Sequence, residues 1–445
     1  MAQTPQATAL DIARLAQAEQ FDQIHGRFAP QLRAIASSDV LQAGWDSAIT
    51  RHGQVKSIGA PVSDPAQGGA ITVRIPMTCE RGVFTLLIAI TDSGELAGLQ
   101  IAPGAAAAPI AAWQPPDYAD PTAFAEHDVL LGPPALAVGA TLSIPADPAS
   151  LPAVVLLAGS GPQDRDETLG RNKLFKDLAW GLASRKVAVL RFDKVTLAHP
   201  DAVRANPNFT LVDEYVPHAI AGVRLLQEQP GIDPERVFVL GHSLGGTITP
   251  RIAQAEPSIA GVILLAGSAE PFHRSLLRQT RYLAALNPDT AAASEPAIQK
   301  LTRQTELVDD PKLSTDTPAT DLPFGLPAAY WLGLRGYRPE HIAAELDRPI
   351  LILQGGRDYQ VTIPDDLHRW ESTLAARPDV TIHVYDADNH CFFTGTGPSS
   401  PAEYEPPQHL DQHVITDIAT WLTSAGPERG ADPSPERAER RRDPY

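Results

Sequence analysis

The chain is short of the residues and motifs that several classes of protein require. Among its 445 residues are two cysteines, Cys79 and Cys391, and two methionines. Cysteines this far apart in sequence can form at most one disulfide, and we expect instead two buried or half-buried thiols in a reducing compartment. No glycine-rich phosphate loop, no zinc-spaced Cys/His cluster and no basic stripe with aromatic residues is visible. We therefore predict no metal site, no cofactor and no nucleic-acid partner.

Positive charge is also scarce. The 36 lysine and arginine residues are outnumbered by 53 aspartate and glutamate residues, which gives a formal net charge of -17. Such an acidic surface favours solubility and repels nucleic acid and anionic membranes. The first residues, MAQTPQATALDIARLAQAEQF, lack the basic region and the apolar core of a signal peptide, and no transmembrane helix is predicted. We therefore expect a cytoplasmic protein that binds no membrane.

Length and pattern predict more than one domain, because 445 residues are too many for one ordinary core. Residues 1–104 combine a helix-like stretch with two or three alternating strands that turn at residues 80–82 and 92–94, which predicts a small α+β domain. Residues 105–123 are rich in small residues and proline and are predicted to be a linker. The charged tail, residues 426–445, is predicted to be disordered.

Residues 124–425 show a different pattern, in which apolar strands alternate with helical stretches. The predicted strands lie in the segments PAVVLLAGSGP, VAVLRFD, RVFVLGHS, GVILLAG, PILILQGGRD and VTIHVYDADNH. Strands that alternate with helices form a mainly parallel sheet with helices on both faces. This part of the chain is therefore predicted to be an α/β domain.

One serine lies in a motif that is typical of catalysis. The stretch RVFVLGHSLGGTITPRIA begins at Arg236 and runs from an apolar strand through G-H-S-L-G into a helix-like pattern. A sharp turn from strand to helix strains its central residue and brings backbone segments close together, which explains the flanking glycines. The motif fits the nucleophile elbow of α/β-hydrolases. Ser243 is therefore the predicted nucleophile, although this short string by itself can also be a purely structural turn.

A serine nucleophile needs a base and an orienting acid, which in this fold follow in the order serine, acid, histidine. The strand in RPILILQGGRDYQV leaves Asp358 at the carboxyl edge of the sheet, where ligand sites of open α/β sheets form. The strand in VTIHVYDADNHCFF ends with His390 in a polar loop. Ser243, Asp358 and His390 are therefore the predicted catalytic triad.

Alternatives exist for the acid and for the histidine beside the nucleophile. Asp365 and Asp366 lie just beyond Asp358 and are the alternative acids, while an aspartate in this position can also simply cap a helix. His242 is adjacent to Ser243 in an extended entry to the turn, so its side chain points away from that of the serine. We predict that His242 is a wall of the substrate pocket and not the base.

Three histidines compete with His390 for the role of base. His383 alternates into a strand and is predicted to be a packed or surface residue. His409 and His413 lie one helical turn apart on what is predicted to be a terminal amphipathic helix. A histidine pair with this spacing can mimic a metal site, but no third ligand is apparent.

Two backbone amides are expected to form an oxyanion hole. Leu244, directly after the nucleophile, provides the first amide, and the loop in LLAGSGPQDRDET provides the second, for which Ser160 is the preferred donor. The acidic and basic residues at 164–166 are predicted to form an arginine–carboxylate network that holds this loop, and Arg191 and Asp193 are assigned the same structural role.

A resemblance to a known family rests on these segments: GSGPQDRDET, LFKDLAWGLASRKVAVLRFDK, VFVLGHSLGG, YWLGLRGYRPEHIAAELDRPILILQGGRDYQV and DNHCFF. They resemble a bacterial family of α/β-hydrolases related to serine aminopeptidases, dienelactone hydrolases and acyl esterases. The resemblance covers nearly the whole chain except the tail, and it implies the triad named above and an esterase-like activity. Members often carry a small N-terminal domain similar to the cone-shaped fold of nuclear transport factor two. Ala158 departs from the family, in which a histidine commonly precedes the glycine of the oxyanion strand.

In this fold an insertion such as residues 268–347 commonly forms a helical cap over the serine. Its aromatic residues Phe324, Tyr330, Trp331 and Tyr337 are candidates to line an apolar pocket for an acyl or aromatic group. Tyr330 and Trp331, together with His242, are the predicted pocket residues. The alternative is that these aromatic side chains join the cap to the core.

The predicted reaction is hydrolysis of a small-molecule carboxylic ester through an acyl-enzyme intermediate. The alternatives on the same fold are acyl transfer to another acceptor and peptide cleavage, for which Glu270, Glu306, Asp309 and Asp310 are available to bind a free amino group. A non-catalytic binding protein that kept the fold is a further alternative. The N-terminal domain is predicted to mediate a homodimer or to shape the mouth of the pocket.

Overall fold

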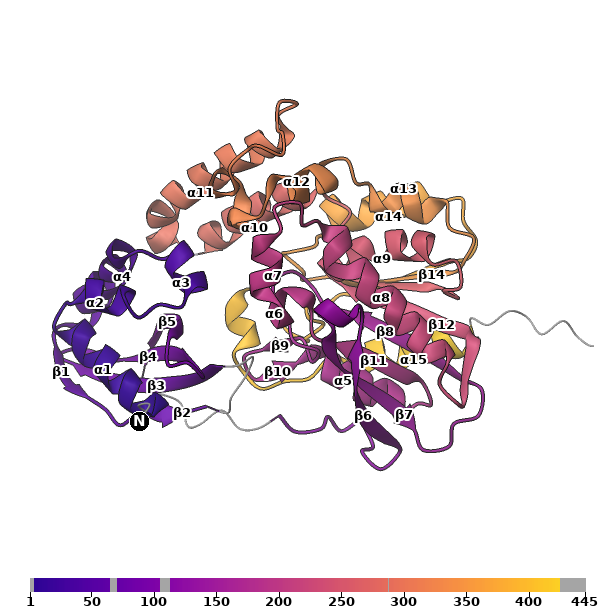
Figure 1. The fold of residues 1–445 in the computed structure, drawn as a ribbon, viewed down its shortest axis with the longest axis horizontal. Helices are drawn as coiled ribbons and strands as arrows, with labels where there is room; N and C mark the ends of the chain where they lie inside the picture. Colours follow the sequence, from indigo (N-terminus) through magenta and orange to yellow (C-terminus); the bar gives the residue numbers. More distant parts are fainter. Residues whose placement is uncertain (1–3, 65–69, 105–112, 287, 425–445) are drawn as a thin grey trace, which may run out of the picture. The chain divides into compact units, whose positions relative to one another are not determined.

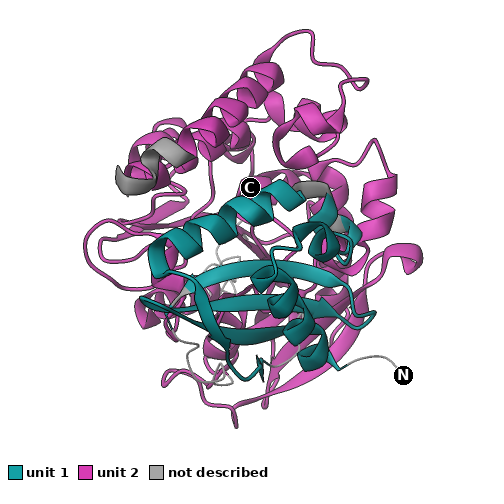
Figure 2. Cartoon of the chain, turned by 90° about the vertical axis from the view of Figure 1, so that its left-hand side faces the viewer, with its two compact units in different colours: residues 1–112 teal, residues 113–445 magenta. Residues whose placement is uncertain are grey.

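The structure is a computed structural model that describes residues 4–64, 70–104, 113–286 and 288–424. The chain divides into two compact units, residues 1–112 and residues 113–445 (Figures 1 and 2). Unit 1 has one hydrophobic core and unit 2 has two. The tail predicted to be disordered, residues 426–445, lies outside the described residues, as do residues 105–112 of the predicted linker.

Unit 1 combines helices with an antiparallel sheet. Its helices are α1 (Pro5–Gln17), α2 (Phe21–His25), α3 (Pro30–Ile35) and α4 (Ser38–His52). Its strands are β1 (Val55–Ile58), β2 (Val62–Ser63), β3 (Ala70–Cys79), β4 (Gly82–Thr91) and β5 (Leu96–Pro103), in the sheet order β1-β3-β4-β5 with β2 beside β3. The predicted turns at residues 80–82 and 92–94 join β3 to β4 and β4 to β5, so the antiparallel strand prediction is confirmed.

Unit 2 is built on an eight-stranded sheet in the order β15-β14-β13-β12-β8-β11-β7-β6. The strands are β6 (Phe124–Leu131), β7 (Val138–Pro145), β8 (Leu151–Leu157), β11 (Ala188–Phe192), β12 (Ile232–His242), β13 (Val262–Leu265), β14 (Ile350–Gly355) and β15 (Val380–Tyr385). Neighbours from β15 to β11 are parallel, whereas β7 and β6 are antiparallel. A small hairpin of β9 (Thr168–Leu169) and β10 (Asn172–Lys173) lies outside this sheet. The predicted mainly parallel sheet is confirmed.

Helices cover both faces of this sheet (Figure 1). On one side the core includes residues of α5 (Leu174–Ala183) and α15 (Gln412–Ser424), and on the other side it includes residues of α8 (Leu211–Gln227), α9 (Leu244–Ala255) and α14 (His368–Leu374). Successive residues of β8 alternate between the two cores, since Val154 and Leu156 belong to one and Val155 and Leu157 to the other. Burial on both faces explains why these strands are continuously apolar.

The chain between β13 and β14 forms a group of helices. They are α10 (Phe272–Leu286), α11 (Pro288–Asp309), α12 (Ala328–Arg335) and α13 (Pro339–Ala344), with short 3₁₀ turns at η2 (Ala319–Asp321) and η3 (Pro323–Gly325). In Figure 1, α10, α11 and α12 lie together at the upper edge of unit 2, in orange tones. This segment has the helical character predicted for residues 268–347.

Remaining helical segments of unit 2 are short. They are η1 (Pro134–Leu136), α6 (Val195–Ala198), α7 (Pro200–Ala205), the π-helical turn η4 (Ile363–Leu367) and η5 (Pro401–Tyr404). Both α6 and α7 follow β11, and η4 follows β14, so they occupy loops at the carboxyl end of the parallel strands.

Part of the predicted linker belongs to unit 2. The rings of Trp113 and Trp180 meet edge to face with centroids 5.0 Å apart, and the Trp113 indole donates a hydrogen bond of 2.8 Å to Asp177 Oδ1. The ring of Phe124 also meets the ring of Trp180 edge to face, with centroids 5.2 Å apart. The prediction of a linker over residues 113–123 is therefore wrong, because the aromatic side chains in this proline-rich stretch pack against α5.

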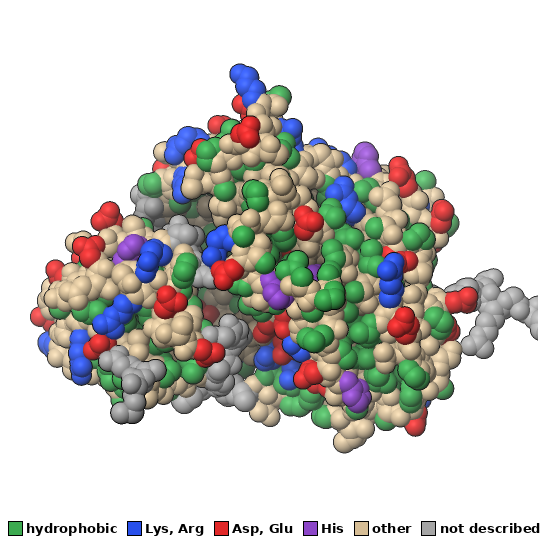
Figure 3. All heavy atoms as spheres, in the orientation of Figure 1, with side chains coloured by type: hydrophobic (Ala, Val, Ile, Leu, Met, Phe, Trp, Pro, Cys, Tyr) green, Lys and Arg blue, Asp and Glu red, His purple; other side chains and the backbone are tan. Residues whose placement is uncertain are grey.

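Three observations concern features predicted from the sequence. Cys79 and Cys391 are both buried free thiols, as expected. On the face seen in Figure 3, basic and acidic side chains are interspersed. Among the described helices, none is both long enough and apolar enough to cross a membrane.

Candidate active site

The chain order reverses at one pair of neighbouring strands. β8 pairs with β11 on one side and with β12 on the other, both in parallel. In open parallel sheets this reversal leaves a crevice at the carboxyl ends of the two strands, where ligands bind. Ser243 directly follows β12, and Gly159 lies two residues beyond the end of β8. The topology therefore brings the predicted nucleophile and the predicted oxyanion loop to the same crevice.

The turn at Ser243 is strained and tightly packed. Ser243 has φ 53° and ψ -119°, a conformation that is uncommon for a residue with a side chain. A Cβ atom on Gly241 would lie 2.2 Å from the carbonyl oxygen of Gly245, and one on Gly245 would lie 2.1 Å from that of Leu157. Only glycine fits at these two positions, so the strand-to-helix turn predicted from the motif is present in the structure.

Asp358 lies in the loop after β14 and His390 in the loop after β15, and their side chains are hydrogen-bonded to each other. The distance from Asp358 Oδ2 to His390 Nδ1 is 2.7 Å, and both side chains are buried. Asp358 Oδ1 accepts hydrogen bonds from the amides of Gln360 (2.7 Å) and Val361 (3.0 Å). A carboxylate can only accept, so the Nδ1 nitrogen carries the proton and Nε2 is left for another partner.

The alternative acids serve other parts of the structure. Asp366 is fully buried, and its Oδ1 accepts hydrogen bonds from the Ser268 hydroxyl (2.7 Å) and the Glu270 amide (2.8 Å). Asp365 binds the hydroxyl of Thr362 at 2.9 Å. Of the three candidate aspartates, Asp358 is the one that contacts His390.

The rival histidines are placed elsewhere. His409 precedes α15, and its Nδ1 lies 3.1 Å from the Asp177 carboxylate, while His413 Nδ1 lies 2.9 Å from Asp411. The prediction that both lie on one helix is wrong, because α15 begins at Gln412. Across the described ranges, no group of three His, Cys, Asp or Glu residues is arranged to hold a metal ion.

His242 is buried beneath the site and does not line the pocket. Its Nδ1 lies 2.9 Å from Glu167 Oε1, and its Nε2 lies 3.0 Å from the carbonyl oxygen of His390. Since both partners are acceptors, the ring satisfies them only as an imidazolium. Burial alone would lower the pKa of His242, but the Glu167 carboxylate outweighs burial and the pKa is raised. The predicted pocket role is wrong because a side chain that alternates away from the serine points into the interior.

The predicted oxyanion donors lie beside the serine. Ser160, Ser243 and Leu244 line one cavity. A Cβ atom on Gly159 would lie 3.2 Å from the Cβ of Ser243, so this loop passes directly against the nucleophile. The Gly159 amide donates to Glu167 Oε1 at 2.7 Å, which leaves the Ser160 amide as the candidate donor of the loop. Leu244 begins helix α9, whose first amides have no partner within the helix.

The cavity at Ser243 is small, about 40 Å³, and eight of its twelve lining residues have polar side chains. Glu270 is its one acidic residue, and Glu270 Oε2 accepts a hydrogen bond of 2.9 Å from Arg278 Nε on α10. Burial raises the pKa of Glu270, and the Arg278 guanidinium opposes this rise. Phe272 provides apolar surface at the same cavity.

Tyr330 and Trp331 lie behind this cavity rather than in its wall. Both are buried, and the Tyr330 hydroxyl donates to Glu214 Oε2 at 2.8 Å. Trp331 stacks on Phe272 with ring centroids 5.9 Å apart. Their prediction as pocket residues is wrong, because this side of α12 faces the core. Both side chains instead belong to one of the two hydrophobic cores of unit 2.

The predicted arginine–carboxylate network is present. Arg165 Nη2 lies 2.7 Å from Asp193 Oδ2, and Arg191 Nε lies 2.9 Å from Asp166 Oδ1. Arg191 also reaches Glu126 at 2.7 Å. These ion pairs tie the loop after β8 to strands β11 and β6, as expected for a loop that must hold its shape.

Sequence reasoning missed three buried charged residues, Glu167, Lys194 and Glu214. They are 2 %, 1 % and 4 % exposed, and Lys194 Nζ lies 2.6 Å from Glu214 Oε1. They come from three separate segments, and each segment by itself has the composition of an ordinary loop or helix start. The one available signal was that Lys194 and Glu167 flank predicted site loops.

Similarity to known proteins identifies the family of this chain. The family described as serine aminopeptidase, S33, matches residues 171–396. An esterase named EstD from Thermotoga maritima is 33 % identical over 406 residues, which cover 91 % of this chain and 92 % of that protein.

Several solved structures are also similar to this chain. An esterase from Pyrococcus furiosus has 15 % identity and a TM-score of 0.44, covering 70 % of this chain and 94 % of that one. Est1E from Butyrivibrio proteoclasticus has 15 % identity and a TM-score of 0.44, covering 67 % and 98 %. A puromycin-hydrolyzing peptidase from Mycobacterium tuberculosis has 17 % identity and a TM-score of 0.43, covering 81 % and 47 %. From the family match and the esterase relative, the chain belongs to the serine aminopeptidase S33 family of α/β-hydrolases and is a hydrolase of the esterase or peptidase type.

Proposed function

We propose that the protein hydrolyses carboxylic esters of small molecules through an acyl-enzyme on Ser243. The observation that carries this proposal is the buried hydrogen bond between Asp358 and His390, at the same strand edge as the strained elbow. His390 Nε2 accepts the proton of Ser243 as the serine oxygen attacks the ester carbonyl carbon. Asp358 holds the imidazole in the tautomer that leaves Nε2 free and stabilises the imidazolium that forms.

The amides of Ser160 and Leu244 stabilise the negative charge on the former carbonyl oxygen. Collapse of this intermediate breaks the ester bond, and His390 returns its proton to the departing alkoxide. Water, deprotonated by His390, then attacks the acyl-enzyme, and a second oxyanion collapses to release the carboxylic acid and free Ser243. Each proton taken up by His390 is returned within the same half-reaction.

Ester cleavage is favoured over aminopeptidase activity by the pairing of Glu270, the one acidic residue that lines the cavity at Ser243. Recognition of a free amino terminus needs an unpaired carboxylate near the serine. Glu270 lines the cavity, but its carboxylate is paired with Arg278. Asp309 is paired with Arg274 at 3.0 Å and with His273. The Thermotoga maritima relative is named an esterase, which supports the same choice.

A direct test combines labelling with substrate comparison. A fluorophosphonate is expected to label Ser243, as shown by mass spectrometry of the modified peptide, and Ser243→Ala is expected to abolish both labelling and hydrolysis of p-nitrophenyl esters. The wild-type protein should hydrolyse these esters much faster than aminoacyl anilides. Labelling of another serine, or faster cleavage of the anilides, would contradict the proposal.

A further inference from the structure

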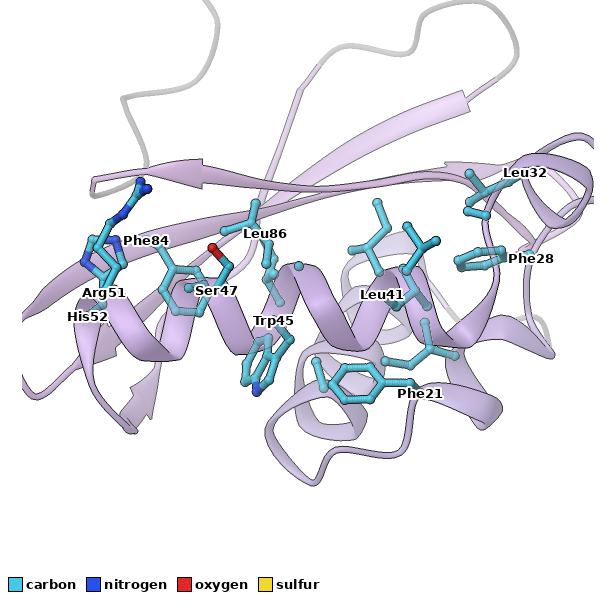
Figure 4. A pocket seen from close by; sticks show the side chains of 18 residues that line it. Phe21, Phe28, Leu32, Leu41, Trp45, Ser47, Arg51, His52, Phe84 and Leu86 are labelled. Atoms are coloured by element: carbon cyan, nitrogen blue, oxygen red, sulfur yellow. The ribbon is translucent and has the colours of Figure 1, made fainter. Parts of the chain in front are cut away.

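Unit 1 contains a cavity of about 420 Å³ beside helix α4 (Figure 4). It is lined by residues of α4, of strands β4 and β5, and of the shorter helices. Fifteen of its eighteen lining residues are apolar or glycine, and the exceptions are Ser47, Arg51 and His52. This volume is in the range of small-molecule binding sites, about 300–1,000 Å³. Nothing in the proposed hydrolysis uses this cavity.

The polar residues gather at one end. Figure 4 shows Arg51 and His52 at one end of the cavity and Phe28 and Leu32 at the other. Arg51 is exposed, and among the described residues it has no hydrogen-bond or ion-pair partner. The other lining residues near Phe28 and Leu32 are apolar. The cavity is thus mainly apolar, with one exposed cationic side chain, Arg51, at one end.

We propose that this cavity binds an amphipathic monocarboxylate, with its alkyl chain against the apolar lining and its carboxylate on Arg51. The planar guanidinium matches a carboxylate with two parallel hydrogen bonds. Such a ligand belongs to the chemical class of acids that ester hydrolysis releases. Binding requires no reaction at Ser243, so it can be tested in a protein that lacks the serine.

The probe is dodecanoate, titrated by calorimetry into full-length Ser243→Ala protein. We expect one site per chain. Gly44→Phe should weaken binding at least tenfold, because a Cβ at Gly44 meets no atom within 4 Å and the added ring fills the cavity. Arg51→Gln should weaken it through the lost carboxylate contact. Gly333→Phe is the matched control, since Gly333 is also a helical glycine with open space around its Cβ, in α12 of unit 2.

Several results would overturn this proposal. One is the absence of dodecanoate binding. Another is an equal affinity for dodecyltrimethylammonium, which carries the same chain and the opposite charge. A third is binding that Gly44→Phe leaves unchanged, because the ligand would then occupy a different site.

A second inference, independent of the first, concerns the buried lysine beneath the oxyanion loop. Lys194 is 1 % exposed, and its ammonium group has three acceptors for its three protons. Nζ lies 2.7 Å from the Gly159 carbonyl oxygen, 2.7 Å from the Tyr215 hydroxyl and 2.6 Å from Glu214 Oε1. Burial lowers the pKa of Lys194 from its usual value, and the Glu214 carboxylate opposes this fall.

The carbonyl that Lys194 binds belongs to the same peptide group as the Ser160 amide. A peptide group is planar, so fixing the direction of its oxygen fixes the direction of its N–H. A cation on the oxygen also draws electron density from the nitrogen, which strengthens the N–H as a donor. The Tyr215 hydroxyl lies 2.9 Å from the same oxygen. On the other side of Gly159, the preceding peptide group donates its N–H to Glu167.

We infer that Lys194 is a positioning residue that orients and polarises the Ser160 amide for the oxyanion. This inference rests on the proposed function, in which that amide stabilises the intermediate. Tyr330 of α12 donates to the second oxygen of Glu214, so the cap segment is connected to the same group of residues. The buried lysine acts through the peptide bond and touches no substrate.

The kinetic test uses a double variant, Lys194→Met with Glu214→Gln, so that no unpaired charge stays buried. We expect kcat to fall about 10- to 100-fold with little change in KM, which is less than the ~10²–10³-fold loss for removal of an oxyanion donor. Affinity for a boronic acid that forms a tetrahedral adduct with Ser243 should fall by the same factor as kcat. Glu214→Gln alone keeps the lysine and is the matched control.

A spectroscopic test reports on the peptide group itself. Labelling with ¹³C-carbonyl glycine and ¹⁵N-serine marks the two Gly–Ser peptide bonds of the chain, at residues 159–160 and 267–268. Loss of Lys194 should shift the signals of the first and leave those of the second unchanged. If the 159–160 signals do not move, the contact is absent. If they move while kcat and boronate affinity stay constant, Lys194 has no role in the reaction.

Failure of the proposed function gives a different pattern. In that case Ser243 would not be labelled and Ser243→Ala would remain active, while the 159–160 signals would still respond to Lys194. Unchanged kcat and boronate affinity count against Lys194 only in a protein whose Ser243 reacts as proposed, whereas unmoved 159–160 signals overturn the inference in either case.

Discussion

The two cavities of the molecule differ in size and in chemistry. The cavity of unit 1 holds about 420 Å³ and has three polar lining residues out of eighteen, whereas the one at Ser243 holds about 40 Å³ and has eight out of twelve. Volume alone would assign the reaction to unit 1. The strained turn at Ser243 and the hydrogen bond between Asp358 and His390 instead support the proposal that the reaction takes place in unit 2, because catalysis depends on oriented polar groups more than on space.

The groups with shifted pKa values also differ between the two units. In unit 1, burial and the neighbouring Glu80 carboxylate raise the pKa of the Cys79 thiol, which lies in the core. In unit 2 the pKa of His242 is raised and that of Lys194 is lowered, and both side chains lie beside the Gly159 loop. Clusters of perturbed groups mark functional sites. We therefore expect substitutions in unit 2 to act on rate and those in unit 1 to act on stability or binding.

The largest expected effect is that of Asp358→Asn. An amide at this position favours the wrong tautomer of His390, which should lower kcat about 10⁴-fold. Asp366→Asn is the matched control, since Asp366 is a buried aspartate from the same loop region that does not contact His390. Steady-state kinetics of the two variants should differ by at least a hundredfold. Equal losses would mean that the acid has been assigned wrongly.

A smaller effect on rate is expected for Glu167→Gln. This substitution removes the negative charge that binds His242 and the Gly159 amide. We expect a loss of about tenfold in kcat, below the ~10²–10³-fold effect of losing an oxyanion donor itself. Because the folded pKa of His242 is raised, the stabilisation by this pair is complete below pH ~6.5 and is lost as the pH rises through the folded value.

The measurement is the difference in melting temperature between wild type and Glu167→Gln across pH. This difference should shrink as the pH rises above about 6.5. A constant difference would show that His242 does not change its charge in this range.

Asp388→Asn should change stability but not the reaction. Burial, with the nearby Asp411 carboxylate, raises the pKa of Asp388 to about 6. A carboxyl group with a raised pKa stabilises the fold while protonated, and this contribution is lost as the pH rises from about 4 through 6. The variant should therefore melt at a higher temperature than wild type at pH 8 and lose this advantage at pH 4. Thermal melts at the two pH values check it, and an advantage at both would contradict the assignment.

The smallest effect is expected in unit 1. Gly44 lies within helix α4, and a Cβ there meets no atom within 4 Å. Gly44→Ala should therefore stabilise unit 1 by about 1 kcal/mol through helix propensity and leave esterase kinetics unchanged. Denaturant unfolding measures the first and ester hydrolysis the second. A loss of activity would show that unit 1 takes part in the reaction, against the comparison above.

Local pattern was sufficient to predict much of unit 2. The six predicted strands correspond to β8, β11, β12, β13, β14 and β15. Four of them, β8, β11, β13 and β14, are buried along their whole length, which explains why their sequences are almost wholly apolar. The elbow was predictable because its glycines are required by backbone contacts within and beside the motif. Asp358 and His390 were predictable because the chain order of this fold fixes which strand ends carry them.

Contacts between distant segments were not predictable. Lys194 and Glu214 pair across twenty residues of sequence, and Glu167 joins a histidine 75 positions away. A single sequence contains no signal for such pairings. The same limit explains the wrong predictions for Tyr330 and Trp331. A helix with aromatic side chains has a similar sequence whether those side chains face a pocket or the core.

The tight packing at the elbow has a consequence for recombination between relatives. Gly245 lies against the Leu157 carbonyl, and a Cβ on Gly246 would lie 2.8 Å from the Cα of Gly267. Three backbone segments, near residues 157, 241–246 and 267, are thus packed closely enough that they must fit one another. A chimera that takes its crossover between residues 157 and 267 joins an elbow from one parent to the supporting backbone of another. Crossovers before residue 150 or after residue 270 keep the three segments from one parent, so active chimeras should be concentrated there.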